Sequence, residues 1–299
     1  MSWRNIVISS PAHLSLDQCS LKIERPEQEA ITVPLEDIAS IVLDHRQITV
    51  TLPLLSALSQ QGAALISCDS AHTPCGVQLP FHQHSRTLRA FQLQLDVSVP
   101  FLKNCWKRII QQKIRNQARC LELVRLPQKS TLRGMTTCVK SGDSDNRESA
   151  AAVQYFAALF PGLKRREDCI INAALNYGYS ILRSCVARCL TAYGFQPALG
   201  IHHCNELNSF NLADDFLEPF RPVVDLWTFL HMRESQSFDK EHRVALVRLL
   251  SCLVKVGQEE VTLQRACDVL CASYVTACRE KAPEALQLPE LMELQTRHE

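Results

Sequence analysis

The chain has 299 residues, a hydrophobic content of 46% and a formal net charge of +1. This length allows two domains with a sizeable core, and the composition is ordinary for a soluble globular protein. No apolar run approaches the roughly 18 residues of a membrane-spanning helix, and the first residues lack the apolar segment of a signal peptide. We therefore expect a cytoplasmic protein, whose overall charge does not by itself indicate a polyanionic partner.

The first 80 residues predict a β-domain. Short runs rich in Ile, Val, Leu and Thr alternate with polar or Pro-containing turns, which is typical of strands. The predicted strands cover residues 5–9, 14–24, 30–34, 40–44, 47–52 and 63–69, and residues 53–61 are predicted as a short helix. Many short strands at close spacing favour a sandwich-like or barrel-like sheet.

The pattern changes near residue 80. Segment 71–85 carries several His, Pro and Gly residues and is predicted as a loop or linker. From about residue 86 the apolar residues recur at helical spacing, as at Leu102, Trp106 and Ile110. Further helices are predicted after the polar loop at 141–148 and over 170–193, 243–256 and 263–279.

Together these patterns predict an α+β fold of two domains. We expect a small, sandwich-like β-domain over residues 1–80, a linker over 81–90 and a larger all-α domain over 91–299.

Charge is unevenly distributed along the helical part. Between residues 97 and 140 there are ten Lys or Arg residues and one acid, Glu122. The basic residues fall between the apolar positions, so they share a face of the predicted helix. Such a face suits the phosphate backbone of a nucleic acid. A solvated helix face balanced by acids elsewhere in the fold explains the same pattern equally well.

The segment from Gly200 to Pro222 combines two histidines with four carboxylates. Asp215 and Glu218 are three residues apart, and side chains at this spacing share a helix face. Their mutual repulsion favours a cation between them, and a hard divalent ion such as Mg²⁺ or Mn²⁺ suits mixed carboxylate and imidazole ligands. His203 is the candidate imidazole.

Each of these residues also has a structural interpretation. Glu148, at the start of a predicted helix, would stabilise the helix dipole. His203 would be a hydrogen-bonded structural residue, and Glu218 would pair with Arg221. The run His202, His203 and Cys204 could suggest zinc, but adjacent residues rarely converge on one ion.

The chain has fourteen cysteines and no Cys-x-x-Cys pair. Cys185 and Cys189, like Cys267 and Cys271, are four residues apart and share a helix face. In a reducing compartment we expect such thiols to be small buried hydrophobic residues rather than metal or redox groups.

Distinctive motifs lie at 10–16, 33–39 and 72–76, around Glu148, at 172–179 and at 200–203. The most specific is Leu212-Ala-Asp-Asp-Phe-Leu-Glu-Pro-Phe-Arg-Pro. Together these motifs resemble those of the CRISPR-associated spacer-acquisition endonuclease and integrase family, in which Met is frequent at the position of Leu217. The resemblance covers essentially the whole chain and is nearest to members from systems with a single RNA-guided effector nuclease.

The resemblance implies that Glu148, His203 and Glu218 are the catalytic residues and ligate Mg²⁺ or Mn²⁺. Asp215 matches an accessory acid, and Tyr177 and Arg221 match positions near the site. The helical domain would then be catalytic, and the β-domain would serve dimerisation or partner binding. The residues expected to contact the DNA backbone are Lys103, Lys107, Arg108, Lys113, Arg115, Arg119, Lys164, Arg165 and Arg166.

The implied reaction is phosphodiester transesterification, in which a 3′-hydroxyl of a short DNA fragment attacks the CRISPR repeat; water in its place would give nuclease activity. The resemblance further implies homodimers, two of which flank a dimer of a small CRISPR-associated adaptation partner in a heterohexamer. Two other functions remain open at this point: a structure-directed endonuclease for branched DNA, and a non-catalytic subunit that shapes DNA.

Overall fold

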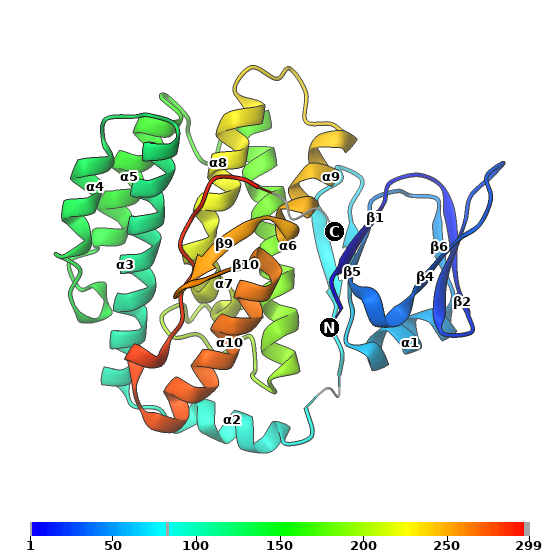
Figure 1. Cartoon of the computed structure of the whole chain (residues 1–299), viewed down its shortest axis with the longest axis horizontal. Helices are drawn as coiled ribbons and strands as arrows, with labels where there is room; N and C mark the ends of the chain where they lie inside the picture. The colour runs from blue at the N-terminus through cyan, green and yellow to red at the C-terminus, as the bar shows by residue number, and fades with distance from the viewer. Residues whose placement is uncertain (1, 82–83, 296–299) are drawn as a thin grey trace.

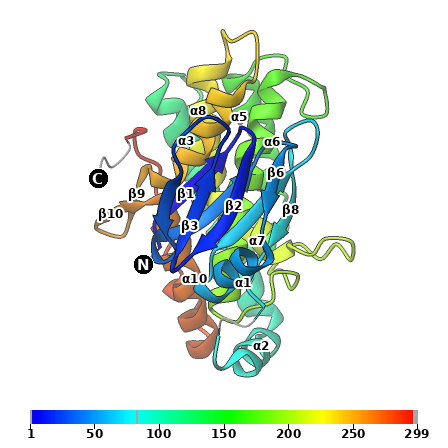
Figure 2. The same ribbon diagram turned by 90° about the vertical axis from the view of Figure 1, so that its right-hand side faces the viewer.

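Two four-stranded sheets form the N-terminal part of the computed structural model, which describes residues 2–81 and 84–295 (Figures 1 and 2). One sheet has the order β1-β5-β7-β8 and the other β4-β3-β2-β6. The strands are β1 Arg4–Ile8, β2 Ala12–Asp17, β3 Ser20–Glu24, β4 Ile31–Pro34, β5 Ile38–Leu43, β6 Ile48–Val50, β7 Ala64–Cys68 and β8 Pro74–Gln78, with helix α1 Leu52–Gln61.

The two sheets share one core. Leu14 and Leu21 from the second sheet pack with Ile41 of β5 and Leu54 of α1, and all four are buried. Burial of these side chains removes apolar surface from water, which is the main force that holds the sheets together. The predicted sandwich-like arrangement is confirmed.

Two strand predictions are wrong in detail. The single strand predicted over 14–24 is the hairpin β2–β3, because Gln18 adopts a φ of 52° and turns the chain. Strand β8 lies inside the segment predicted as a loop and pairs antiparallel with β7. Pro74 is tolerated there because it is the first residue of an edge strand. At this position the sheet needs no hydrogen bond from a backbone N–H, which proline lacks. Residues 82 and 83 of the predicted loop lie outside the described residues.

Nine helices of the described residues follow α1, with a β-hairpin among them (Figure 1). They are α2 Thr87–Leu95, α3 Val99–Leu123, α4 Lys129–Thr136, α5 Arg147–Leu159, α6 Ile170–Ala192, α7 Asn211–Leu217, α8 Arg221–Met232, α9 Lys240–Arg248 and α10 Leu263–Glu280. The short 3₁₀ turn η3, Glu218–Phe220, joins α7 to α8.

The helical part is not entirely α. The helix predicted over 243–256 ends at Arg248, and the chain forms β9 Leu253–Val256 and β10 Glu259–Thr262 instead. Gly257 turns between these strands with a φ of 62°. Val254 and Val256 are buried on one face of β9, and this alternation is that of a strand.

Helix α6 contacts both the first sheet and α8. Val42 and Ile66, on the sheet face that points away from the second sheet, belong to the helical core. A Cβ on Gly178 of α6 would lie 2.5 Å from Cγ1 of Val224, so only glycine permits this close approach of α6 to α8. The approach places the first turn of α8 beside α6, next to the predicted ligands.

The buried acid Asp44 also links the sheets of the N-terminal part to the helical part. Asp44, at the end of β5, accepts hydrogen bonds from Arg243 Nε of α9 at 2.7 Å and pairs with His72 Nδ1 at 2.6 Å. Within the described residues no helix has the length and apolarity needed to cross a membrane.

Candidate metal centre

Helices α3 and α5 and the turn η3 bring Glu148, Glu218 and Lys113 together. Glu148 lies in the first turn of α5, whose backbone N–H groups at Arg147 and Glu148 donate to the carboxylate of Asp143 at 2.9 and 3.0 Å. Glu218 opens η3 and is 4% exposed. The capping carboxylate and the short turn therefore fix the backbone from which both acids project.

Lys113 lies between the two acids. Its Nζ is 2.7 Å from Oε1 of Glu148 and 2.5 Å from Oε2 of Glu218, and the residue is 7% exposed. This position differs from the sequence prediction, which placed Lys113 on the DNA-binding face. The ammonium is instead buried under α5 and η3, where it neutralises two carboxylates.

Arg221 provides the second positive charge. Its Nε donates to Oε1 of Glu218 at 2.9 Å, and its guanidinium lies 4.5 Å from the ring centre of Tyr179. Burial alone would raise the pKa of Glu218, but Arg221 and then Lys113 outweigh it and lower that pKa to about 2. Glu148, Glu218, Lys113 and Arg221, here called the acid site, thus carry equal numbers of negative and positive charges.

His203 is oriented by Asp215. Nδ1 of His203 lies 2.6 Å from Oδ1 of Asp215, whose other oxygen accepts from the backbone N–H groups of Ile201 and His202 at 2.5 and 3.0 Å. With Nδ1–H donating to the carboxylate, Nε2 is the nitrogen left for a ligand. A Cβ on Gly200 would lie 2.2 Å from the carbonyl oxygen of His203, so this tight loop requires glycine.

The electrostatics connect His203 to the acid site. The hydrogen bond to Asp215 raises the pKa of His203, burial lowers it, and the charges of Asp215, Glu218 and Glu148 raise it further. Trp106 of α3 supports the loop, because its ring stacks on His202 at 4.3 Å and meets the edge of His203 at 5.7 Å.

The donor set fits a hard divalent cation. Two carboxylates and an imidazole with a carboxylate behind it are typical ligands and supporting groups for Mg²⁺ or Mn²⁺. In the described part of the chain, no three His, Cys, Asp or Glu residues already stand at metal-binding geometry. The ammonium of Lys113 nevertheless occupies a position between two of the three predicted ligands, so a cation is already accommodated there.

Tyr177 does not lie where the sequence prediction placed it. It is buried against Phe238 at 5.8 Å, and the charged groups around its hydroxyl are Asp44 and Arg243, on the side of the sheet. Tyr179, two residues later, faces the acid site instead.

Tyr179 and Asp225 were missed by the sequence reasoning. The hydroxyl of Tyr179 donates to Oδ1 of the buried Asp225. Burial raises the pKa of Asp225 to about 6, against the hydrogen bond from Tyr179 and the nearby charges of Arg221 and Lys113, which lower it. The spacing of Asp225 four residues after Arg221, on one helix face, is the signal that could have identified it.

A small cavity adjoins the acid site. It has a volume of about 110 Å³, and its lining includes Lys113, Arg165, Tyr179 and Arg221. Arg165 donates to the side-chain oxygens of Asn172 and Asn176, which hold its guanidinium at the cavity. Arg165 therefore lies beside the acid site, whereas its neighbours Lys164 and Arg166 are exposed.

The remaining basic residues of the prediction lie on or near the surface of α3. Lys103 and Arg115 are exposed, and Lys107 and Arg108 are half-buried. Arg119 pairs with Glu122 at 2.8 Å, which partly neutralises that end of the helix.

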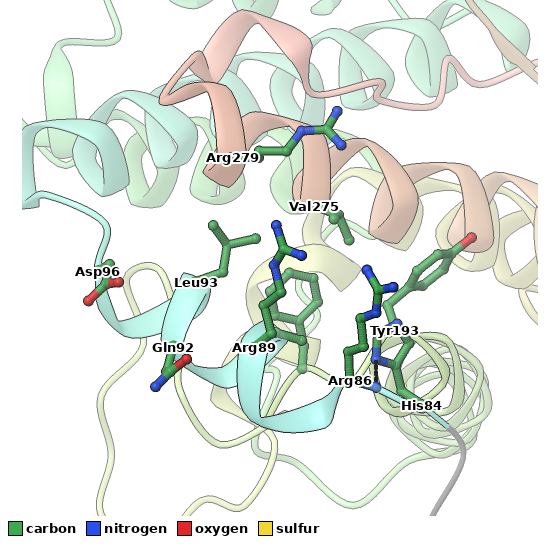
Figure 3. A pocket seen from close by; sticks show the side chains of 11 residues that line it. His84, Arg86, Arg89, Gln92, Leu93, Asp96, Tyr193, Val275 and Arg279 are labelled. Atoms are coloured by element: carbon green, nitrogen blue, oxygen red, sulfur yellow. Dashed lines mark hydrogen bonds between the residues drawn. The ribbon is translucent and has the colours of Figure 1, made fainter.

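A larger cavity of about 490 Å³ lies away from the acid site, between α2 and α10. Figure 3 shows Arg86, the N-cap residue of α2, and Arg89 of α2 on the side of the cavity that faces Arg279 of α10, with Asp96 at the far end of α2. Within the described residues neither Arg86 nor Arg89 forms an ion pair. We call Arg86, Arg89 and Arg279 the arginine pocket.

Eight of the fourteen cysteines are buried, as expected for small hydrophobic residues, whereas Cys19, Cys75, Cys138 and Cys204 are exposed. Cys185 and Cys189 of α6 lie against Cys267 and Cys271 of α10. All four are free and buried, and burial contributes to raising the pKa of each thiol.

Comparison with known proteins identifies relatives over nearly the whole length. The model of the family described as CRISPR associated protein Cas1 matches residues 6–249. The CRISPR-associated endonuclease Cas1 of Neisseria meningitidis serogroup C (strain 8013) is 41% identical over 300 residues, which cover 98% of each chain.

The fold is shared with solved structures, among them a Cas6-RT-Cas1–Cas2 complex and a casposase. A chain of that complex has a TM-score of 0.75 and 19% identity, over 98% of this chain and 36% of that chain. The casposase, bound to integration product, has a TM-score of 0.75 and 16% identity, over 93% and 91%. The family model, the 41% identical relative and the motif that builds the acid site agree, and the chain therefore belongs to the Cas1 family of CRISPR-associated endonucleases.

Proposed function

We propose that this protein is a metal-dependent integrase of CRISPR adaptation, which joins the 3′-hydroxyl ends of short DNA fragments to the repeat array as new spacers. The observation that carries the proposal is the pairing of Glu148 and Glu218 around Lys113, with the charges of both acids acting on the Asp215-oriented His203, in a Cas1-family chain. The endonuclease name of the 41% identical relative and the integration product bound by the casposase support it.

Glu148, Glu218 and Nε2 of His203 would hold Mg²⁺ or Mn²⁺. When bound, the ion supplies positive charge that polarises the attacked phosphate. Asp215 would keep the imidazole in the tautomer whose Nε2 can ligate, since its carboxylate accepts a hydrogen bond from Nδ1–H.

The positive side chains at the adjoining cavity would stabilise the reacting phosphate. Arg165 and Arg221 are both held by hydrogen bonds, so their guanidinium groups are oriented before substrate arrives. Such preorganised charge stabilises the negative charge that develops while the new bond to phosphorus forms and the bond to the displaced oxygen breaks. The same groups would serve hydrolysis when water replaces the 3′-hydroxyl.

DNA would lie along the exposed basic side chains. Lys103 and Arg115 of α3 and the exposed pair Lys164 and Arg166 remain the proposed backbone contacts. Contacts of this type fix the position of a duplex and read little sequence.

The proposed assembly contains a homodimer and a small adaptation partner. The Cas1–Cas2 complex among the fold neighbours supports a partner of the Cas2 type, and two dimers around one partner dimer would form a heterohexamer. Light scattering on a mixture of the two proteins measures the mass of the complex, which distinguishes a heterohexamer from smaller assemblies.

A reconstituted joining assay tests the proposal. It contains the protein, its small partner, Mg²⁺ or Mn²⁺, a short duplex with 3′-hydroxyl ends and a supercoiled plasmid that carries the repeat array. We expect covalent joining near the first repeat, and its loss in Glu148→Ala and His203→Ala variants that still fold and bind DNA.

Two controls separate the outcomes. Glu206→Ala removes an exposed acid of the same segment and is expected to leave joining intact, and a duplex with 3′-deoxy ends should not be joined. Joining that persists in Glu148→Ala, His203→Ala and Glu218→Ala would refute the assignment. Nicking of branched DNA without any joining would favour a structure-directed endonuclease instead.

A further inference from the structure

We propose that Lys113 is an internal counterion that competes with the divalent cation for the carboxylates of Glu148 and Glu218, and that it must be displaced for the ion to bind. The inference rests on the proposed metal centre and adds a residue that regulates how readily that centre fills. Lys113 would thereby limit the affinity of the protein for metal.

Competition follows from which oxygen atoms are available. Oε1 of Glu218 already accepts from Arg221 Nε at 2.9 Å. Oε2 is therefore the oxygen that a metal ion would use, and it lies 2.5 Å from Nζ of Lys113. The same ammonium is 2.7 Å from Oε1 of Glu148. A divalent ion that bridges these two acids would need the space that the ammonium fills.

The charges lead to the same conclusion. Lys113 and Arg221 already balance the two carboxylates of the acid site. Lys113 and Glu218 are largely buried, and the side chains of Glu148 and Arg221 are 25% and 26% exposed. A divalent ion added with Lys113 in place would leave an excess of positive charge at short range in a region of low polarity, which is strongly unfavourable. Displacement of the ammonium removes part of that excess.

The structure also provides room for the displaced side chain. Lys113 lines the cavity of about 110 Å³ that it shares with Gln117 and Arg165. A lysine is a compact charge on a flexible four-carbon stem, so it can turn into this cavity while α3 stays in place. Arg221 is held by both Glu218 and the ring of Tyr179 and lacks that freedom.

A metal-free role explains why a lysine is buried here. Without either an ion or Lys113, Glu148 would have no cation beside it among the described residues and Glu218 would keep only Arg221, and an unpaired charge in a buried region is destabilising. Lys113 would hold the centre in its folded geometry until metal arrives. A lysine with a purely structural role would not move when metal binds. Its replacement by a neutral side chain of similar length would then leave the metal affinity unchanged.

Mn²⁺ titration of the full-length protein, after removal of metal with a chelator, tests the proposal. Calorimetry or the Mn²⁺ electron paramagnetic resonance signal gives the affinity. We expect Lys113→Met to bind Mn²⁺ about ten-fold or more tightly than the unmodified protein, because the competing charge is gone. Lys103→Met, on the exposed side of the same helix, is the matched control and should not change the affinity.

Thermal unfolding gives a second measurement. Lys113→Met should melt at a lower temperature than the unmodified protein without metal, and Mn²⁺ should raise its melting temperature by more. If Lys113→Met does not fold, Lys113→Arg carries the test, because a guanidinium that binds both carboxylates more rigidly should weaken Mn²⁺ binding several-fold.

The possible results distinguish the two levels of the proposal. Unmodified protein that binds Mn²⁺ with an affinity that Lys113→Met does not increase would overturn the counterion role and leave the metal centre standing. Binding by Lys113→Met alone would support the counterion role in its strongest form. Absence of binding in every variant would overturn both the counterion role and the metal centre.

Discussion

The acid site and the arginine pocket hold charge in opposite ways. In the acid site each carboxylate has a cation beside it, at 2.5 to 2.9 Å, and the groups are mostly buried. In the pocket three guanidinium groups face one cavity, and Asp96 lies apart from them. Among the described residues, Arg279 alone of the three has an ion-pair partner, Glu280, at 3.4 Å. Burial forces neutralisation, because an unpaired charge in the interior is costly, whereas solvent screens exposed like charges. The first region is therefore built around a cation, and the second is suited to an anion.

The largest expected effect comes from breaking the balance of the acid site. Glu218→Gln removes the buried anion that Lys113 and Arg221 share and leaves Glu148 as the remaining partner of Lys113. We expect a loss of about 3–5 kcal/mol in the free energy of unfolding. Urea denaturation measures it, with Glu206→Gln as the exposed control. DNA joining should be abolished as well, because the ligand is gone. A variant as stable as the unmodified protein would contradict the buried charge balance.

The pH dependence of the free energy of unfolding should also distinguish the two regions. Buried titratable groups beside the acid site, such as Asp225, should contribute to it strongly, and the exposed arginines of the arginine pocket should not. The pKa of Asp225 is about 6 in the fold against an ordinary 3.8, so the folded state keeps a proton that the unfolded chain releases. The stabilisation from this proton is therefore fully present below about pH 4 and is lost as the pH rises to about 6. Above about pH 6, Asp225 causes no further change in stability with pH. Asp225→Asn should remove this decline, which we expect to be roughly 1–3 kcal/mol.

Denaturation curves at several pH values between 4 and 7 measure the decline. The variant and the unmodified protein should differ in slope only below about pH 6. Parallel curves over the whole range would show that Asp225 keeps its ordinary pKa.

The smallest effect is expected at the arginine pocket. Exchange of both Arg86 and Arg89 for Gln should weaken DNA binding a few-fold. The slope of log DNA affinity against log salt concentration should fall by the amount that up to about two phosphate contacts contribute. Mn²⁺ affinity should not change, because the pocket lies away from the acid site. Exchange of the exposed Arg233 and Arg248 is the matched control. Unaltered DNA affinity at every salt concentration would exclude the pocket from DNA binding.

The sequence predicted those features that depend on local pattern. The apolar spacing at Trp106 and Ile110 predicted α3, and the motif at 212–222 predicted that Glu218 and Asp215 belong to one site. The separate positions of these two acids could not be predicted, because η3 interrupts the helix at Pro219. Asp215 turns to the His203 loop, while Glu218 meets Lys113.

Lys113 shows why the remaining features could not be predicted. Its spacing from Ile110 and Ile114 places it beside the apolar stripe of α3, where a lysine is usually solvated. Only the packing of α5 and η3 over that position buries it, and such packing joins segments far apart in the sequence. Tyr177 and Tyr179 differ in the same way: both are buried on α6, and which of them faces the site depends on the elements that cover each side of the helix.

The buried Asp44 bears on whether the helical part of the chain can be expressed without the sheets. The two side-chain partners of this residue, His72 and Arg243, come from segments that flank most of the helical part. A fragment that began after the sheets would lose the anion of Arg243 and would expose the apolar neighbours of Val42 and Ile66 to water. Helices α3 to α10 expressed alone should therefore be prone to aggregation, and biochemical dissection is better served by point substitutions in the intact protein.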